Sequence, residues 1–377
     1  MDLSIWEKES FYAPADVIII GSGFVGLWSA YYLKKRNPRL SITIVDRGII
    51  PTGASTRNAG FACFGSVTEL IADSEKIGEE NMLDIVRLRY QGLKKIRKTF
   101  RRTDIGYEEL GGYELITAEQ PYELDRLRSV IDALNQKLRK ITHKKAFYLN
   151  DEGIKNFGFA SVQHLVENRL EGQLHSGKLC LQLLQLVQSM GVQVLNNIEV
   201  KAFEKINGKI ELDTAQGFRL TAERLLFCTN AFAKQLMPLL DVEPARGQVL
   251  VTSPIPSLKF RGTFHYDEGF YYFRNLGNRV LLGGARNQAF EEEHSYNMTT
   301  TDRIQGALEK FLREVILPGE NFTIDHRWSG IMGIGREKKP IVQELQENIF
   351  GALRMSGMGV ALAPEIGKII AKKITAS

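Results

Sequence analysis

The chain has 377 residues, of which 44% are hydrophobic and 25% are charged. These values are typical of a globular protein, and the length suits two domains, or one domain with a large insertion, better than a single ordinary core. Lysine and arginine exceed aspartate and glutamate by only 49 − 44 = 5, which gives no reason to expect a nucleic-acid partner. No apolar stretch approaches the roughly 20 residues of a membrane-spanning helix. The N-terminus lacks the apolar core of a secretory signal and the three cysteines are widely spaced, so we expect a cytoplasmic protein with free thiols and no membrane span.

A pattern typical of dinucleotide-binding proteins stands near the start of the sequence. A strand-like apolar run over residues 17–20 leads into a glycine-rich turn, followed by a helix-like run over 27–33 and a second strand over 41–45. This is the order of elements in a βαβ nucleotide-binding unit. The alternative is an ordinary strand–turn–helix in which the glycines occur by chance.

The turn residues have separate physical reasons to be there. Gly21 permits a sharp turn, Gly23 lets a pyrophosphate approach the backbone, and Gly26 allows the helix to pack closely on the strand. Asp46 lies 20 residues beyond Gly26, where a carboxylate is expected to bind ribose hydroxyls. We therefore predict that this unit contacts the cofactor through Gly21, Ser22, Gly23, Phe24, Val25, Gly26, Asp46 and Arg47.

The remaining pattern predicts two interleaved domains without internal repeats. Residues 80–145 are expected to be mainly helical, with a strand over 113–116. Further helices are expected over 179–190 and 302–315. Short strands are expected over 192–195, 199–205, 209–213, 225–228, 248–252, 263–266, 270–274 and 279–284. Strand–turn–helix patterning then returns at 328–335 and 350–372.

A second motif distinguishes between nucleotides. Residues 53–60 read Gly-Ala-Ser-Thr-Arg-Asn-Ala-Gly, and a plain nicotinamide domain has no need for such a segment. Here the sequence resembles the D-amino-acid-oxidase-like superfamily of FAD enzymes, which includes glycine oxidase, sarcosine oxidase and γ-glutamylputrescine oxidase. Further matches stand in the family's order at residues 228–231, 246–249, 271–272, 282–284, 328–330 and 356–364.

The resemblance implies an α/β fold in which a Rossmann-like FAD-binding domain of the glutathione-reductase type is interleaved with an antiparallel-sheet α+β substrate domain. The FAD-binding domain is expected over 1–100, 165–240 and 326–377, and the substrate domain over 101–164 and 241–325. The helix that follows residue 359 is expected to direct its N-terminus at the flavin pyrimidine ring. Beyond the first motif, the FAD-binding residues implied are Ser55, Arg57, Asn58, Gly60, Val200, Thr229, Asn230, Gly330, Gly357, Met358, Gly359 and Val360.

The family reaction moves a hydride from the carbon beside an amine nitrogen to the flavin. In glycine and D-amino acid oxidases an arginine shortly after a tryptophan binds the substrate carboxylate, whereas here Met332 takes that position after Trp328. We therefore expect an amine, a secondary amine or a longer γ-glutamyl-type substrate rather than a simple α-amino acid. Arg274, Arg286, Arg336 and His265 are the other side chains that could supply charge to the site.

Two adjacent tyrosines and one absent lysine bear on catalysis. Tyr271 and Tyr272 neighbour each other on one strand, so they face opposite sides of the sheet, and we expect one of them to line the substrate cavity. Sarcosine-oxidase-like members carry a lysine on the next strand to activate oxygen, but residues 280–284 contain none. The sequence therefore leaves open whether the electron acceptor is O₂ or another molecule. The site residues assigned to catalysis are Tyr271, Tyr272 and Met332.

Two other functions are compatible with the sequence. The first is an NAD(P)-dependent dehydrogenase, which leaves the segment at 55–60 unexplained. The second is a flavin-carrying subunit of a larger complex, inactive alone, with basic residues 94–102 as its docking face. A thioether from Cys63 to the flavin is the alternative to a buried, unmodified cysteine. The histidines have no ligand spacing, so no metal is inferred, and the oligomeric state is left open.

Overall fold

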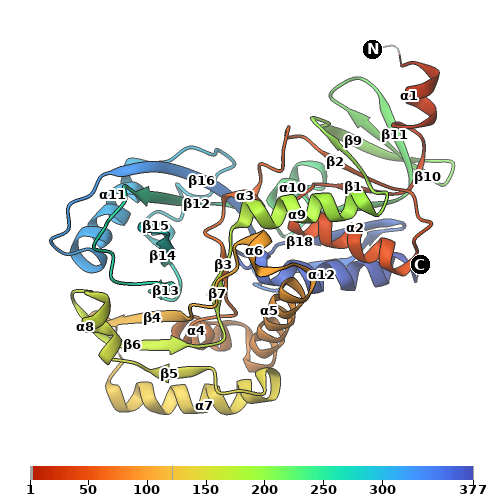
Figure 1. The fold of residues 1–377 in the computed structure, drawn as a ribbon. Coiled ribbons are helices and arrows are strands. Elements are labelled where there is room, and N and C mark those ends of the chain that lie inside the picture. The colour runs from red at the N-terminus through yellow and green to blue at the C-terminus, as the bar shows by residue number, and fades with distance from the viewer. Residues whose placement is uncertain (1–2, 121, 377) are drawn as a thin grey trace.

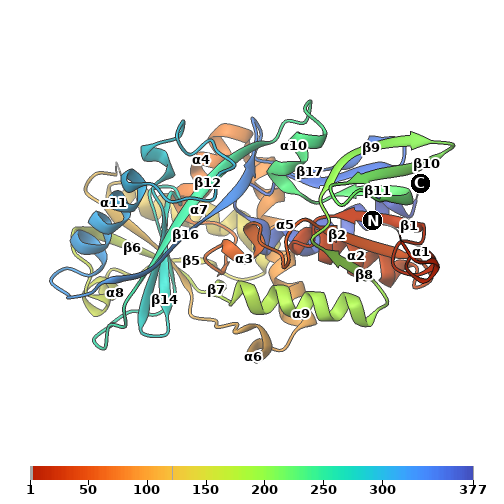
Figure 2. The same ribbon diagram turned by 90° about the horizontal axis from the view of Figure 1, so that it is seen from above.

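The computed structural model describes residues 3–120 and 122–376. Within these ranges the strands form two eight-stranded sheets and one two-stranded ribbon. The two sheets occupy opposite ends of an elongated molecule, with helices between them (Figures 1 and 2). Segments from the beginning, middle and end of the chain contribute to the first sheet, so the predicted α/β fold with interleaved parts is confirmed.

The first sheet has a parallel core built around β1 (Ala15–Ile20). This strand pairs in parallel with β2 and β11, and five of its six residues are buried. Such a near-continuous apolar run is typical of a strand covered on both faces. The strands in spatial order are β17 (Ile341–Gln346), β18 (Ile349–Leu353), β11 (Arg219–Phe227), β1, β2 (Ile42–Asp46) and β8 (Gln193–Asn196), with β10 (Lys209–Thr214) paired to β11 and β9 (Val200–Ile206) paired to β10.

Helices cover one face of this sheet and a strand meander covers the other. The helical layer is α2 (Phe24–Arg36), α5 (Glu79–Thr99), α9 (Ser176–Ser189) and α12 (Gly359–Ile374). In this layer α12 packs between α2 and α5, and α9 packs against α2. The hairpin of β9 and β10, with the first half of β11, closes the other face around Ile18 and Ile210.

The second sheet is antiparallel except for one parallel pair, β4 with β13. Its strands in spatial order are β16 (Ile324–Ile334), β12 (Glu243–Thr252), β15 (Arg279–Gly284), β14 (Tyr271–Leu276), β13 (Thr263–Tyr266), β4 (Gly112–Thr117), β6 (Val162–Asn168) and β5 (Phe147–Leu149). An aromatic core around Phe264 and Phe273, whose rings stack at 4.7 Å, fills one face beneath α11 (Asp302–Phe311).

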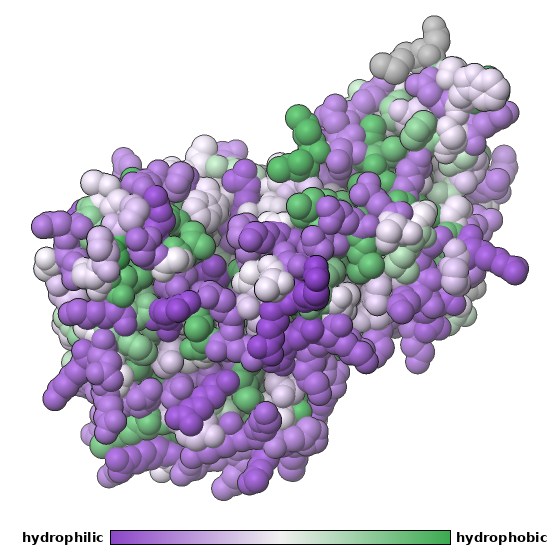
Figure 3. All heavy atoms as spheres, viewed as in Figure 1, coloured by the Kyte–Doolittle hydropathy of each residue, from purple (hydrophilic) through white to green (hydrophobic). Residues whose placement is uncertain are grey.

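The shorter elements connect these layers. The helices are α1 (Ile5–Glu9), α3 (Ala54–Arg57), α4 (Val67–Ile77), α6 (Arg102–Ile105), α7 (Leu124–Thr142), α8 (Glu152–Phe157), α10 (Ala233–Leu236) and α11 (Asp302–Phe311). The ribbon pairs β3 (Phe61–Ala62) with β7 (Gly172–Gln173). Figure 3 shows a mainly hydrophilic surface with apolar side chains in small groups on the face viewed. No helix within residues 3–120 and 122–376 is both long and apolar enough to cross a membrane.

One predicted element has a different form. Residues 328–335 were expected as strand–turn–helix, but they continue as strand β16, which pairs antiparallel with β12 along its length. Both strands reach from the second sheet towards the first (Figure 2). The glycines at 330 and 333 therefore serve close packing within a strand: a Cβ at Gly330 would lie 3.0 Å from Cβ of Arg57. The division of the chain at 326 remains a prediction, and β16 itself belongs to the second sheet.

Candidate active site

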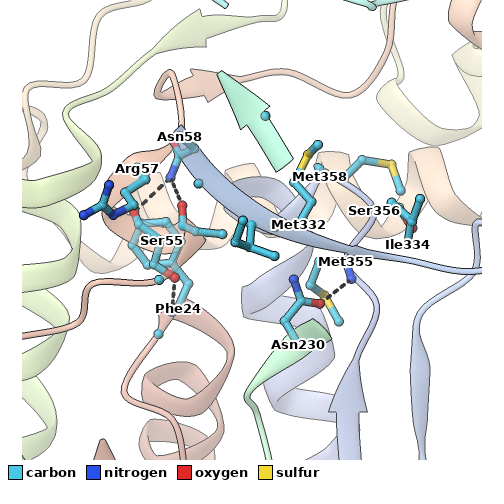
Figure 4. Close-up of a pocket in the computed structure, with 18 of the residues that line it drawn as sticks. Phe24, Ser55, Arg57, Asn58, Asn230, Met332, Ile334, Met355, Ser356 and Met358 are labelled. Atoms are coloured by element: carbon cyan, nitrogen blue, oxygen red, sulfur yellow. Dashed lines mark hydrogen bonds between the residues drawn. The ribbon is translucent and has the colours of Figure 1, made fainter. Parts of the chain in front are cut away.

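A cavity of about 800 Å³ is lined by residues of both large sheets. In Figure 4, Phe24, Ser55, Arg57 and Asn58 lie on one side of it, and Met332, Met358 and their neighbours lie on the other. Of the residues assigned to cofactor binding or catalysis from the sequence, nineteen line this cavity, a count taken within residues 3–120 and 122–376. They are Gly21, Gly23, Phe24, Val25, Asp46, Arg47, Ser55, Arg57, Asn58, Val200, Thr229, Asn230, Tyr272, Gly330, Met332, Gly357, Met358, Gly359 and Val360.

Four predicted site residues do not line the cavity. Ser22 is fully buried, and its amide and hydroxyl both donate to Asp46. Gly26 faces the turn, where a Cβ would lie 2.0 Å from the carbonyl oxygen of Gly21. Gly60 has a φ of +74° and packs on Leu174, and Tyr271 points to the far side of the second sheet. Ser22, Gly26 and Gly60 pack behind the residues that line the cavity, and Tyr271 belongs to the aromatic core of the second sheet.

The nucleotide end of the cavity is the junction of β1 with α2. The first residue before α2 is Gly23, and the helix has no side-chain cap. Its N-terminal amides and dipole therefore suit a phosphate. A Cβ at Gly23 would lie 2.9 Å from the hydroxyl of Ser55, which accepts a 2.8 Å hydrogen bond from the amide of Phe24. Asp46 is fixed at the end of β2 by bonds from Ser22 and from the amide of Gly48 at 2.9 Å.

The second motif is held in shape by its own polar side chains. Asn58 donates to the carbonyls of Ala54 and Ser55 at 3.0 and 2.8 Å and accepts from the amide of Gly60 at 2.8 Å. Arg57 donates to the carbonyl of Ser329 at 2.9 Å, which ties α3 to β16. The motif thus presents a rigid backbone to the cavity, because Asn58 and Arg57 bind neighbouring backbone groups.

The loop before α12 closes the cavity opposite α3. Ser356 and Gly357 have φ values of +47° and +81°, so the chain turns sharply here and brings the start of α12 to the cavity. The side-chain oxygen of Asn230 holds the loop by accepting from the amides of Arg354 and Met355 at 3.0 and 3.3 Å. Two helix N-termini, a ribose-type carboxylate and a rigid polar segment therefore surround one elongated space, and this donor set fits FAD.

The end of the cavity nearest the second sheet is apolar and aromatic. The ring of Tyr272 covers Gly283, where a Cβ would lie 2.5 Å from the ring, and it packs edge-on against Phe61 at 5.9 Å. Burial raises the pKa of Tyr272 to about 12, so its phenol is protonated. Phe61 also meets His265 edge-on at 5.1 Å. Phe61 and His265 line the cavity beside Met332, and no sequence motif pointed to Phe61.

A buried charge cluster borders the same space. Lys338 donates to Glu69 at 3.0 Å and to Asp73 at 2.6 Å, and Arg89 donates to Glu69 at 2.9 Å. Burial alone would raise the pKa of Glu69, but the charges of Arg89 and Lys338 outweigh it and hold that pKa well below its usual range. Glu69 and Asp73 are four residues apart on α4, which is a weak signal of a shared face. Lys338, which pairs with both, lies 269 and 265 residues away from them in sequence. The cluster therefore could not be predicted from the sequence.

Cys63 lies at the edge of this cluster. Its sulfur accepts a hydrogen bond from Arg89 at 3.4 Å. Burial raises the pKa of Cys63 to about 12 despite that neighbouring charge. The residue is therefore a protonated thiol within the cavity wall.

Comparison with known proteins identifies the class. A model of the family described as FAD dependent oxidoreductase (DAO) matches residues 16–373. The chain therefore belongs to this family, as the sequence resemblance predicted, and FAD is its cofactor.

Individual relatives are distant but extend over nearly the whole chain. A probable oxidoreductase OrdL of Rhizobium meliloti is 24% identical, with 95% of this chain and 82% of the relative covered. Gamma-glutamylputrescine oxidoreductase of Escherichia coli is 21% identical over 95% of this chain and 83% of the relative. The crystal structure of glycine oxidase from Geobacillus kaustophilus superposes with a TM-score of 0.78 and 22% identity, covering 97% of this chain and 95% of that one.

Proposed function

We propose that this FAD-dependent oxidoreductase oxidises the C–N bond of an amine or amino-acid-type substrate. The observation that carries the proposal is the continuity of one cavity from the nucleotide end, at Gly23, to the aromatic chamber around Tyr272. A small organic molecule in that chamber would lie directly beside the end of the cofactor site. The relative named gamma-glutamylputrescine oxidoreductase supports an amine as the reacting group.

When bound, FAD supplies the acceptor for a hydride lost from the carbon beside the substrate nitrogen, whose lone pair then forms the C=N bond of an imine that water hydrolyses. The side chains of Phe61, Val249 and Met332 form an apolar wall of the chamber, and apolar surroundings favour a neutral amine, the form able to release hydride. Burial lowers the pKa of His265 to about 4, so its neutral ring adds no charge that would oppose this. The protonated phenol of Tyr272 is a donor that can orient the substrate.

An absorption spectrum with anaerobic substrate addition tests the proposal. The purified protein is expected to show oxidised-flavin bands that bleach when one class of amines or amino acids is added without oxygen. Protein that binds FAD but is bleached by no member of an amine and amino-acid panel, while 2-hydroxy acids bleach it, would contradict C–N oxidation.

The electron acceptor is tested by readmitting air to the bleached protein. Strand β15 reads Arg-Val-Leu-Leu-Gly-Gly over residues 279–284, so the lysine of sarcosine-oxidase-like members has no counterpart on this strand. We propose that reoxidation by O₂ is slow and that an artificial acceptor dye restores the flavin bands faster. Rapid recovery in air would instead assign the protein as an oxidase.

The basic surface on α5 and α6 does not favour the function of a docking subunit. Arg97 and Arg102 pair with Glu109 at 2.9 and 3.0 Å, and Arg101 pairs with Asp104 at 2.9 Å. These pairs neutralise part of the charge that the sequence suggested. Turnover by the isolated chain, followed in the same anaerobic experiment, separates the two functions.

A further inference from the structure

One cation in the cavity wall, Arg286, has no ion-pair partner among residues 3–120 and 122–376. Arg286, in the turn after β15, lines the chamber together with Tyr272 and His265. Among residues 3–120 and 122–376, no carboxylate lies within ion-pair distance of its guanidinium, and its guanidinium makes no hydrogen bond. Its close contact is the ring of Phe290, whose centroid is 4.7 Å away. A partly buried guanidinium in this state has five donors ready for an anion.

The acid whose charge acts on Arg286, Glu293, is already engaged with other residues. Glu293 accepts two hydrogen bonds from Arg246, at 3.0 and 2.7 Å, and one from Gln248 at 2.9 Å. These bonds engage both of its oxygens and hold them on β12. Glu293 therefore acts on Arg286 only at a distance, and burial lowers the pKa of Arg286 below its ordinary value.

The other cations considered for the chamber are paired, held by backbone carbonyls or outside the cavity. Lys338 pairs with two carboxylates and Arg89 with one. Arg274, another candidate from the sequence, donates to the carbonyls of Gly60 and Leu174 at 3.1 and 2.8 Å and is structural. Arg336 is 90% exposed and is not among the cavity-lining residues.

A chain of close contacts places Arg286 on the substrate side of the cavity. The sulfur of Met332 lies 3.4 Å from the position of a Cβ at Gly357, on the loop before α12. The terminal carbon of Met332 and the hydroxyl of Tyr272 lie 3.4 and 3.7 Å from a Cβ at Gly247. Tyr272 in turn covers Gly283, three residues before Arg286. The order from cofactor loop outward is therefore Met332, Tyr272, Arg286.

We propose that Arg286 binds a carboxylate of the substrate, in place of the arginine that is absent at position 332. The substrate is then an amine that carries a carboxylate, held by the second sheet rather than by the stretch after Trp328. That the bound carboxylate belongs to the substrate rests on the proposed C–N oxidation. That Arg286 binds an anion does not depend on it. A planar guanidinium suits a carboxylate because both can form two parallel hydrogen bonds.

Ligand binding to the FAD-loaded protein tests the anion site without turnover. The probes are 2-furoate and its neutral counterpart 2-furamide. Their binding is measured by the change that each causes in the flavin absorption bands. In Arg286→Met the dissociation constant for 2-furoate is expected to rise roughly 10- to 100-fold, and that for 2-furamide is expected to stay unchanged. The dissociation constant for 2-furoate in Arg286→Lys should lie between those of the wild type and Arg286→Met, because a lysine keeps the charge but cannot form two parallel hydrogen bonds to a carboxylate. Arg336→Met, which removes an exposed guanidinium, is the matched control.

Each outcome decides the matter. An equal loss for both probes, an unchanged affinity for 2-furoate in Arg286→Met, or no binding of 2-furoate to the wild type would overturn the role of Arg286. Flavin content of each variant is measured first, and Arg286→Lys replaces Arg286→Met if the latter fails to hold FAD. Bleaching of the wild type by amines without a carboxylate, as readily as by amino acids, would overturn the carboxylate preference while leaving C–N oxidation intact. Absence of bleaching by any amine would overturn C–N oxidation alone.

Discussion

At the scale of single residues, burial rather than sequence spacing decides what the cysteines can do. Cys63, Cys180 and Cys228 are all free, and burial raises the pKa of each thiol, to about 12 for Cys63 and Cys180. The thiolate is the reactive form, so a thiol with so high a pKa stays protonated and unreactive at neutral pH. Cys63 lies close to the cofactor site and is nevertheless a poor nucleophile.

We expect the folded, FAD-loaded protein to show almost no thiol reactive with a disulfide reagent at pH 8. After denaturation all three cysteines should react and the FAD should separate from the protein. Counting thiols before and after unfolding, together with the flavin left on the precipitated chain, measures both. Two reactive thiols after unfolding, with flavin retained, would instead show a thioether at Cys63.

The site residues that could be predicted from the sequence are those that lie in a local motif. Gly21, Gly23 and Asp46 are spaced by the geometry of one βαβ unit, so a short window is enough to find them. Lys338 reaches the cavity only through tertiary packing, and Phe61, although it directly follows the motif at residues 53–60, carries no pattern that marks it as a cavity residue. Tyr271 and Tyr272 could not be told apart, since alternation on a strand says that they differ but not which one faces the cavity.

At the scale of elements, one glycine sets how closely two helices pack. A Cβ at Gly92 in α5 would lie 1.8 Å from the carbonyl oxygen of Ala361 in α12. Because the obstacle is backbone, the helices would have to separate. Since the first turn of α12 lines the cavity, that separation would move the loop at residues 357–359.

We expect Gly92→Ala to lower the free energy of unfolding by roughly 1–3 kcal/mol and to weaken FAD binding. Gly306→Ala is the matched control, because Gly306 is an exposed position in α11 where a Cβ meets nothing within 4 Å. That variant should be unchanged or more stable by up to about 1 kcal/mol. Urea unfolding and FAD titration of both variants provide the comparison, and equal effects would show that the α5–α12 approach does not limit stability.

Most of the predicted strands and helices are present, but β11 and β12 begin six and five residues before the predicted starts, and β6 and β17 were not predicted. At residues 328–335 the predicted form was wrong, because glycines in a strand were interpreted as a turn. In β16 the glycines face Arg57 and Asn230, at 3.0 and 2.4 Å from the places their Cβ atoms would take. A glycine that makes room for another segment and a glycine that makes a turn look alike in a sequence.

At the scale of the whole molecule, two buried carboxyls hold the loop that joins the FAD motif to α4. Glu171 accepts hydrogen bonds from the amides of Phe64 and Gly65 at 2.7 and 3.3 Å. Glu114 accepts from the hydroxyl of Ser66 at 2.8 Å and from the amide of Thr68. Burial outweighs these bonds and raises the pKa of Glu114 to about 7 and that of Glu171 to about 8.

These shifts make stability fall as the pH rises. A carboxyl whose pKa is raised by folding binds more protons in the folded state, so its contribution is complete at low pH and is lost as the pH passes its folded pKa. His265 acts in the opposite direction below pH 6.5, because burial lowers its pKa to about 4. The loss from each carboxyl runs from its ordinary pKa of 4.5 up to its folded pKa, about 7 for Glu114 and about 8 for Glu171, and amounts to up to about 1.4 kcal/mol per pH unit for each. Because His265 opposes this loss below pH 6.5, the net fall in stability is expected between pH 6.5 and 8, and stability should level off above pH 8.

Glu114→Gln and Glu171→Gln should flatten that slope, since a neutral amide has a similar shape and no proton to lose. Each variant should be less stable than the wild type at pH 5.5, and this difference in the free energy of unfolding should be smaller at pH 6.5. At pH 9 the wild type must bury a negative charge, so the difference should shrink further or reverse. Glu223→Gln, at a side chain that is 61% exposed, is the control and should follow the wild type throughout. Urea unfolding at a series of pH values measures the slopes, and parallel slopes for all four proteins would mean that both carboxyls stay ionised in the folded state. In that case the hydrogen bonds from the loop, rather than burial, would dominate their protonation.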